Sequence, residues 1–124
     1  RGLGDVYKRQ ILMGICTNKR QFVTEKLIQE MNLSKFFTTI VGARDNIPLK
    51  PKPNMLILTM EGFNTKNKMF YMVGDTSNDI DAAKAANIKS IAVAGGYTHK
   101  DVNNLGATHT LKNMKDIIKL LSLS

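Results

Sequence analysis

The sequence has little of what membrane, secreted and zinc-finger proteins depend on. Its single cysteine, Cys16, allows no internal disulfide, and no C-x-x-C motif is present. The apolar stretches are far shorter than the roughly 20 residues that span a bilayer, and no hydrophobic signal segment opens the chain. A cytoplasmic location with no membrane contact is therefore expected.

Aromatic residues are also scarce, at 6%, while 18 Lys and Arg against 10 Asp and Glu leave a net charge of +8. The basic residues are spread as singles and pairs, with no aromatic residues interleaved to stack on bases. This pattern disfavours nucleic acid as a partner and is compatible with an enzyme of small phosphorylated metabolites. With 124 residues, 43% of them hydrophobic, the chain has room for one ordinary domain.

Residues 1–10 contain two glycines and scattered charges but no helical or strand period. The segment resembles translated sequencing-adapter read-through that recurs in front of unrelated proteins. We predict that residues 1–10 are non-native, rather than a mobile natural terminus, and that the domain comprises residues 11–124.

From residue 11 on, apolar runs typical of buried parallel strands alternate with segments of helical period. Such βαβ units require a parallel sheet with right-handed crossovers. The predicted fold class is α/β, a doubly wound, Rossmann-like sheet in three α/β/α layers. The predicted strands span 11–16, 38–43, 69–73, 90–94 and, at the edge, 108–111, and the predicted helices span 18–32, 53–62, 78–86 and 114–121, with a helical turn near 101–105.

Local signals predict the ends of these helices. Asn18 is a good N-cap for the first helix, and Pro53 suits the first position of the second, which Gly62 ends. Asn87 tolerates the left-handed backbone that follows the third. The predicted core-facing stripes are Val23, Leu27, Ile28 and Met31 in the first helix and Met114, Ile117, Ile118 and Leu121 in the last.

Polar residues follow the predicted strands, at the edge where open parallel sheets bind ligands. Thr17 and Asn18 follow the first strand, Lys50 precedes the second helix, and Asp75 and Asp79 follow the third strand. A hydroxyl and an amide can bind phosphoryl oxygens, an ammonium offsets their charge, and carboxylates are ligands for Mg²⁺. Together they predict a phosphate-and-magnesium site. Singly, each also suits a structural role as helix cap, surface lysine or turn former.

Three motifs in order carry a family resemblance: T-N-K at 17–19, K-P-K-P at 50–53 and G-D-T-S-N-D at 74–79. They resemble motifs two, three and four of the haloacid dehalogenase superfamily, in the forms usual for its phosphoglycolate phosphatase-like branch. The resemblance covers about residues 11–121. Each motif alone is weak, but three in order on the right strands are specific.

The resemblance implies a magnesium-dependent phosphomonoester hydrolase with an aspartyl-phosphate intermediate. Thr17 would hydrogen-bond the phosphoryl group, Asn18 would orient that group or the substrate, and Lys50 would offset negative charge. Asp75 would bind Mg²⁺. Asp79 would be either a second ligand through water or the partner that positions Lys50.

One departure from the family limits what this chain is expected to do. The first motif, D-x-D-G-[ST], which supplies the nucleophilic and acid/base aspartates, is absent from the sequence, and so is the helical cap. We therefore expect the C-terminal half of a phosphatase core, lacking its first core strand, that is inactive alone.

Two other functional classes remain open. A noncatalytic phosphate-binding or regulatory module would need a partner to fill the open sheet position. A receiver-type phosphoacceptor domain shares the α/β layout but would place acidic residues after its early strands, where Thr17 and Asn18 stand instead.

Overall fold

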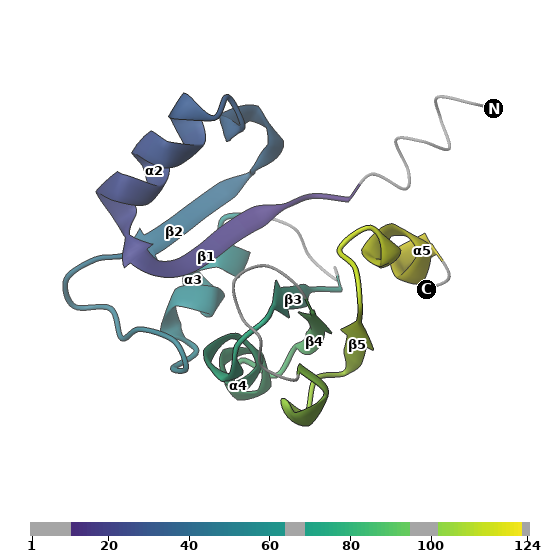
Figure 1. Cartoon of the computed structure of the whole chain (residues 1–124). Coiled ribbons are helices and arrows are strands. Elements are labelled where there is room, and N and C mark those ends of the chain that lie inside the picture. Colours follow the sequence, from purple (N-terminus) through teal and green to yellow (C-terminus); the bar gives the residue numbers. More distant parts are fainter. Residues whose placement is uncertain (1–10, 64–68, 95–101, 123–124) are drawn as a thin grey trace.

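Strands and helices alternate along the chain in the computed structural model, which describes residues 11–63, 69–94 and 102–122 (Figure 1). None of the helices in these ranges is long and apolar enough to cross a membrane. The elements are β1 (Gly14–Arg20), α2 (Gln21–Glu30), η1 (Ser34–Phe36), β2 (Thr39–Ala43), α3 (Asn54–Glu61), β3 (Tyr71–Gly74), α4 (Ser77–Ala85), β4 (Lys89–Val93), η2 (Val102–Asn104), β5 (His109–Leu111) and α5 (Asp116–Ser122).

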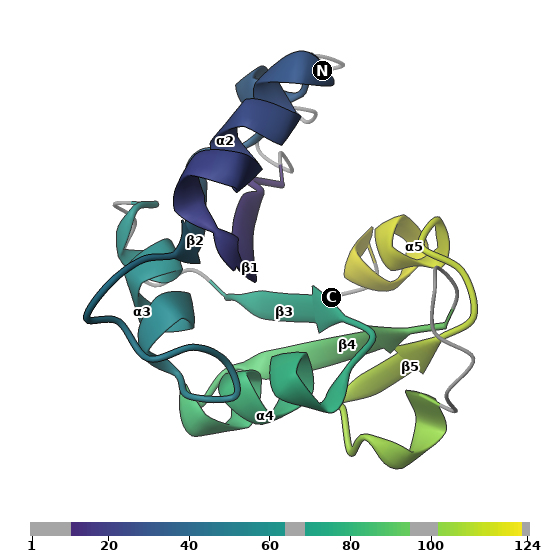
Figure 2. The ribbon, with the colours of Figure 1, turned by 60° about the vertical axis from the view of Figure 1, so that its left-hand side comes forward.

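The described strands form two parallel sheets, β1–β2 and β3–β4–β5, instead of one continuous sheet. Helices α2 and α3 lie on opposite faces of the first sheet (Figure 1), and α4 and α5 lie on opposite faces of the second (Figure 2). The α/β class with parallel strands and helices on both faces is confirmed. The predicted edge strand is also confirmed, because β5 pairs only with β4 among the described strands.

The two sheets are joined by side-chain packing. Met72 of β3, Leu56 of α3, and Ala82 and Ala83 of α4 form a buried cluster, and Cys16 of β1 packs against it. Within the described residues, however, β1 pairs only with β2 and β3 only with β4. Each of these two strands therefore has one edge outside any ladder, as expected for a sheet that lacks a strand at this position.

Short-range signals predict several helix ends correctly. Gly62 is the C-cap residue of α3, and Pro53 stands at its N-cap, one residue before the predicted place. Asn87 follows α4 with φ of 60°, in the left-handed region that asparagine tolerates. Asn87 thus follows α4 because of its backbone preference, whereas Gly62 has ordinary helical dihedrals and leaves room for the Thr39 side chain, which a Cβ atom there would meet.

Two predictions about the first helix are wrong. Asn18 does not cap it, because β1 continues to Arg20, which is the N-cap residue and makes no side-chain cap bond. The helix buries Thr24 and Ile28, whose face lies on the β1–β2 sheet, whereas Val23, Leu27 and Met31 are 43% to 55% exposed. Thr24 can be buried because its hydroxyl donates to the Arg20 carbonyl at 2.9 Å.

The predicted stripe of the last helix also differs from the structure. Met114 precedes α5 in a turn and is 62% exposed, since the helix begins only at Asp116. The backbone N–H of Asp116 donates to the Asn113 carbonyl, which closes that turn. The side chains of Ile118 and Leu121 lie outside the described part of the chain.

The separate sheets lead to a prediction about the isolated chain. Each buried backbone group left without a hydrogen-bond partner costs about 1–3 kcal/mol. Helix α2 also exposes apolar side chains, namely Val23, Leu27, Met31 and Phe22, the last of which is 76% exposed. We expect residues 1–124 alone to be molten, aggregated or dependent on a partner, measured by thermal melting and amide exchange. A sharp, reversible melt of a monomer with amide protection throughout would contradict this.

Candidate functional site

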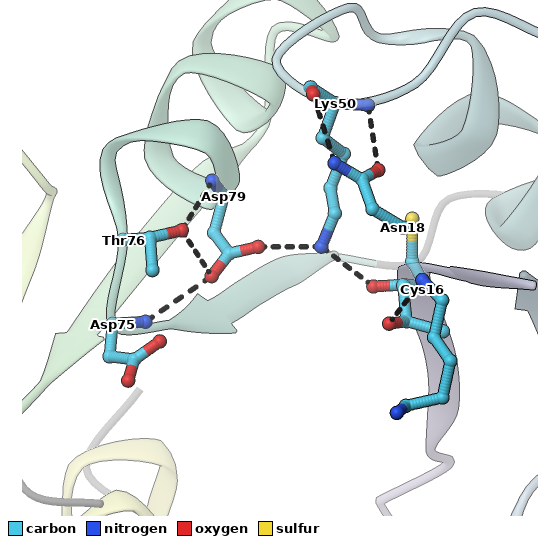
Figure 3. A network of polar contacts seen from close by, with 8 residues as sticks. Cys16, Asn18, Lys50, Asp75, Thr76 and Asp79 are labelled. Atoms are coloured by element: carbon cyan, nitrogen blue, oxygen red, sulfur yellow. Dashed lines mark hydrogen bonds and ion pairs between the residues drawn. The ribbon is translucent and has the colours of Figure 1, made fainter. Parts of the chain in front are cut away.

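The predicted site residues converge where β1 and β3 end (Figure 3). Asn18 lies on β1, Lys50 lies in the loop between β2 and α3, and Asp79 lies in the first turn of α4. These three residues, up to 61 positions apart in the sequence, are joined by direct hydrogen bonds, from the Asn18 side chain to the Lys50 backbone and from the Lys50 side chain to Asp79. The structure thus brings together residues from all three motifs at the carboxyl ends of the strands.

Lys50 lies at the centre of this network. Its Nζ is 2.5 Å from Asp79 Oδ1 and donates to the Cys16 carbonyl oxygen at 2.8 Å. The side chains of Lys50 and Asp79 are only 8% and 13% exposed. Because Cys16 belongs to β1 and Asp79 follows β3, the Lys50 ammonium links the two sheets.

Asp79 is held by the start of its own helix. Its Oδ2 accepts hydrogen bonds from Thr76 Oγ1 at 3.1 Å and from the Asp75 backbone N–H at 3.3 Å. Thr76 Oγ1 in turn accepts the Asp79 N–H at 3.4 Å and caps α4. Asp79 thus accepts three hydrogen bonds across its two carboxylate oxygens, which fits the Lys50-positioning alternative, while the role of a metal ligand through water stays a prediction.

Gly74 lets Asp79 approach the end of β3. A Cβ atom at position 74 would collide with the Asp79 carboxylate. Any side chain there would push Asp79 away from Lys50. The glycine that precedes Asp75 in the G-D motif is thus required by a close approach.

Asn18 contacts the backbone of Lys50. Its Oδ1 accepts the Lys50 N–H at 3.0 Å, and its Nδ2 donates to the Lys50 carbonyl at 3.1 Å. Asn18 thus lies in the predicted site, although not as a helix cap, and its role toward phosphate stays a prediction.

The side chains of Thr17 and Asp75 lie at the same edge and make no hydrogen bond to the side chains of Lys50 or Asp79; Asp75 contacts Asp79 only through its backbone N–H. Thr17 Oγ1 accepts the Lys19 N–H at 3.1 Å, which leaves its hydroxyl proton for another acceptor. The Asp75 carboxylate points away from that of Asp79 (Figure 3). Both side chains are half-buried.

Cys16 contributes its backbone carbonyl to the site, and burial raises the pKa of its thiol. A hydrogen bond with Thr59 and the charge of Lys50 act in the opposite direction but do not outweigh burial. The thiol is therefore protonated at neutral pH, as expected of a residue that fills the strand rather than of a nucleophile.

Thr76 and Gly74 shape the surroundings of Asp79, and neither was singled out from the sequence as a site residue. A signal for Thr76 was present, since T-x-x-D over 76–79 has the spacing of a capping box. The role of the Cys16 carbonyl had no such signal, because it depends on Lys50, which is 34 residues away.

Comparisons with known proteins assign the chain to a family. The family model described as haloacid dehalogenase-like hydrolase matches residues 2–93. The chain belongs to this family. The matched range extends into residues 1–10, whose non-native origin stays a prediction.

The relatives of this haloacid dehalogenase-like chain include phosphoglycolate phosphatases. The chain is 29% identical over 122 residues to that of Escherichia coli strain K12 and 30% to that of Photorhabdus laumondii. These alignments cover 98% of the chain but 48% and 52% of the relatives. The chain thus spans about half the length of the curated relatives it matches.

Solved structures confirm the haloacid dehalogenase-like fold. A predicted phosphatase from Clostridium acetobutylicum superimposes with a TM-score of 0.81 at 22% identity, over 98% of this chain and 57% of that one. A predicted phosphoglycolate phosphatase from Haemophilus somnus superimposes with a TM-score of 0.80 at 21% identity, over 95% of this chain and 53% of that one.

The Lys50–Asp79 pair should contribute to stability in any form of the protein that unfolds cooperatively. Removing one partner of a buried ion pair leaves an uncompensated charge, so Asp79→Asn should lower the free energy of unfolding by about 3–5 kcal/mol. The control is Asp45→Asn, because Asp45 pairs with Arg20 at 4.0 Å with both side chains exposed. This variant should change the free energy by at most about 0.5 kcal/mol. Equal effects in chemical denaturation would contradict the assignment.

Proposed function

We propose that this chain is the part of a magnesium-dependent phosphomonoester hydrolase that holds the phosphoryl group of a small phosphorylated metabolite such as 2-phosphoglycolate. One observation carries the proposal: a buried lysine ammonium is held between a carboxylate and a backbone carbonyl at the carboxyl ends of parallel strands. The family membership and the phosphatase relatives support the same reaction class. The spread of the basic residues and the lone Cys16 support a cytoplasmic enzyme that does not bind nucleic acid.

The proposed roles follow from what each group can donate or accept. The Thr17 hydroxyl donates a hydrogen bond to a phosphoryl oxygen, since its own bond to Lys19 uses it only as an acceptor. Lys50 offsets negative charge on the phosphate, and its surroundings strengthen that effect because the ammonium is shielded from water. Asp79 acts as a positioning residue, since its carboxylate accepts hydrogen bonds from the Lys50 ammonium and from Thr76.

The oxygen donors of this chain can supply part of a magnesium site. No group of three or more His, Cys, Asp or Glu side chains in the described residues could hold a metal ion alone. Mg²⁺, however, is often bound by only one or two carboxylates together with water and substrate phosphate. The half-buried Asp75 carboxylate, which points away from Asp79, fits one such position. A magnesium ion bound there would neutralise phosphoryl charge.

The nucleophilic aspartate would come from outside this sequence. We propose that the complete protein, meaning residues 11–124 together with the upstream sequence in the source genome, carries D-x-D-G-[ST] on a strand between β1 and β3. Covalent catalysis divides one difficult displacement into two easier steps, and the groups in this chain cannot replace it.

The activity of the two forms tests this proposal. Residues 1–124 should release no phosphate from 2-phosphoglycolate above background with Mg²⁺ present, whereas the complete protein should hydrolyse it. Phosphate release by the short chain, or none from any phosphomonoester by the complete protein, would contradict the proposal.

Two lysines of one motif make a matched pair in the complete protein. Lys50→Ala should lower kcat/KM by about 10²–10³, the usual loss for one preorganised charge at a developing oxyanion. Lys52→Ala should have little effect, since Lys52 is exposed. Equal losses in steady-state kinetics would mean that the motif is in the wrong register.

Two aspartates give a second pair. Asp75→Asn should lower the rate and raise the magnesium concentration needed for half-maximal activity, because an amide is a weaker ligand for Mg²⁺ than a carboxylate. Asp81→Asn should change neither value, since Asp81 lies exposed on α4. A magnesium titration that does not distinguish the two variants would remove the metal assignment.

A further inference from the structure

The buried Lys50 side chain extends from a segment without regular structure. Residues 44–53 contain turns and bends but neither strand nor helix. Loops of this kind are usually the mobile parts of a fold, because few backbone hydrogen bonds hold them. Lys50 itself is nevertheless only 9% exposed. Something other than secondary structure must fix it.

Asn18 makes two hydrogen bonds to the backbone of this one residue. Its carbonyl oxygen accepts the Lys50 N–H at 3.0 Å, and its amide nitrogen donates to the Lys50 carbonyl at 3.1 Å. The bonds are partly buried and join residues 32 positions apart. The primary amide suits this contact because it carries a donor and an acceptor side by side. It pairs with Lys50 much as a neighbouring strand would.

We propose that Asn18 is a positioning residue for Lys50, rather than a ligand of the phosphoryl group or the substrate; this role rests on the proposed phosphatase function. Asn18 fixes the backbone end of the lysine, while Asp79 and the Cys16 carbonyl fix the ammonium end. The long side chain is thereby held at both ends before substrate arrives.

One strand contacts both ends of Lys50. β1 supplies the Cys16 carbonyl for the ammonium and, two residues later, the Asn18 side-chain amide for the Lys50 backbone. A side chain held in this way loses little further freedom in the transition state.

Amide exchange in the complete protein, followed by NMR, tests the contact independently of catalysis. Asn18→Ala should speed exchange of the Lys50 N–H by about tenfold or more, from the loss of two hydrogen bonds of ordinary strength. The Thr38 N–H, which donates to the Met13 carbonyl at 2.8 Å where β1 and β2 run side by side, should keep its rate. Asn54→Ala, at an exposed position near Lys50, is the control. The proposal would be overturned if the exchange rate of the Lys50 N–H did not change, or if the exchange rates of all slow amides rose by the same factor.

A double-mutant cycle on 2-phosphoglycolate hydrolysis then tests how Asn18 acts. If Asn18 works through Lys50, Asn18→Ala should lower kcat about tenfold with little change in KM. In a Lys50→Ala background it should cause no further loss. Losses that multiply, or a raised KM, would show direct substrate contact and overturn the proposal. If the complete protein hydrolyses no phosphomonoester, the proposed function is wrong. The amide exchange experiment then still tests whether Asn18 fixes the Lys50 backbone.

Discussion

The structure depends on one interaction, the Lys50 ammonium held between the Asp79 carboxylate and the Cys16 carbonyl. The two sheets share no backbone ladder in the described residues, so this polar link and the apolar cluster around Met72 join them. A buried ammonium is stable only with close partners, since its loss of hydration is large. The positions of β1, α4 and the loop before α3 are thus coupled through one atom.

The surrounding residues all serve that geometry. Thr76 holds Asp79 at the start of α4, Gly74 leaves room for its carboxylate, and Asn18 holds the Lys50 backbone. In the proposed function, the same restraint prepares a positive charge for a phosphoryl group. Fixed charges of this kind need little rearrangement during reaction, which is the main source of their catalytic effect.

Sequence patterns predicted the parts of this fold that depend on neighbouring residues. Asn87 follows α4 because its backbone tolerates the left-handed region, Gly62 stands at the end of α3 as predicted, and the apolar runs became parallel strands near the expected places. Of the predicted α2 stripe, Ile28 is buried as expected, but Val23, Leu27 and Met31 are exposed, because helical period shows which residues are apolar but not what covers them. Val23 and Leu27 lie one position away from the face that packs on the sheet.

In the candidate site, too, the sequence predicted what depends on neighbouring residues but not what depends on distant contacts. The motifs placed Lys50 and Asp79 in one site, but that the Asp79 carboxylate contacts Lys50 and Thr76 is seen only in the structure. Asn18 was predicted as a helix cap because its local context favours one. Its actual partner lies 32 residues away, beyond the reach of local rules.

The most direct test of the account is a crystal structure of the complete protein with bound orthophosphate. If Lys50 binds the phosphoryl group as proposed, a phosphate oxygen should lie within hydrogen-bond distance of Lys50 Nζ while the ammonium still contacts Asp79. A phosphate bound elsewhere, or a Lys50 side chain turned out to solvent while Asp79 contacts the ligand site directly, would contradict it.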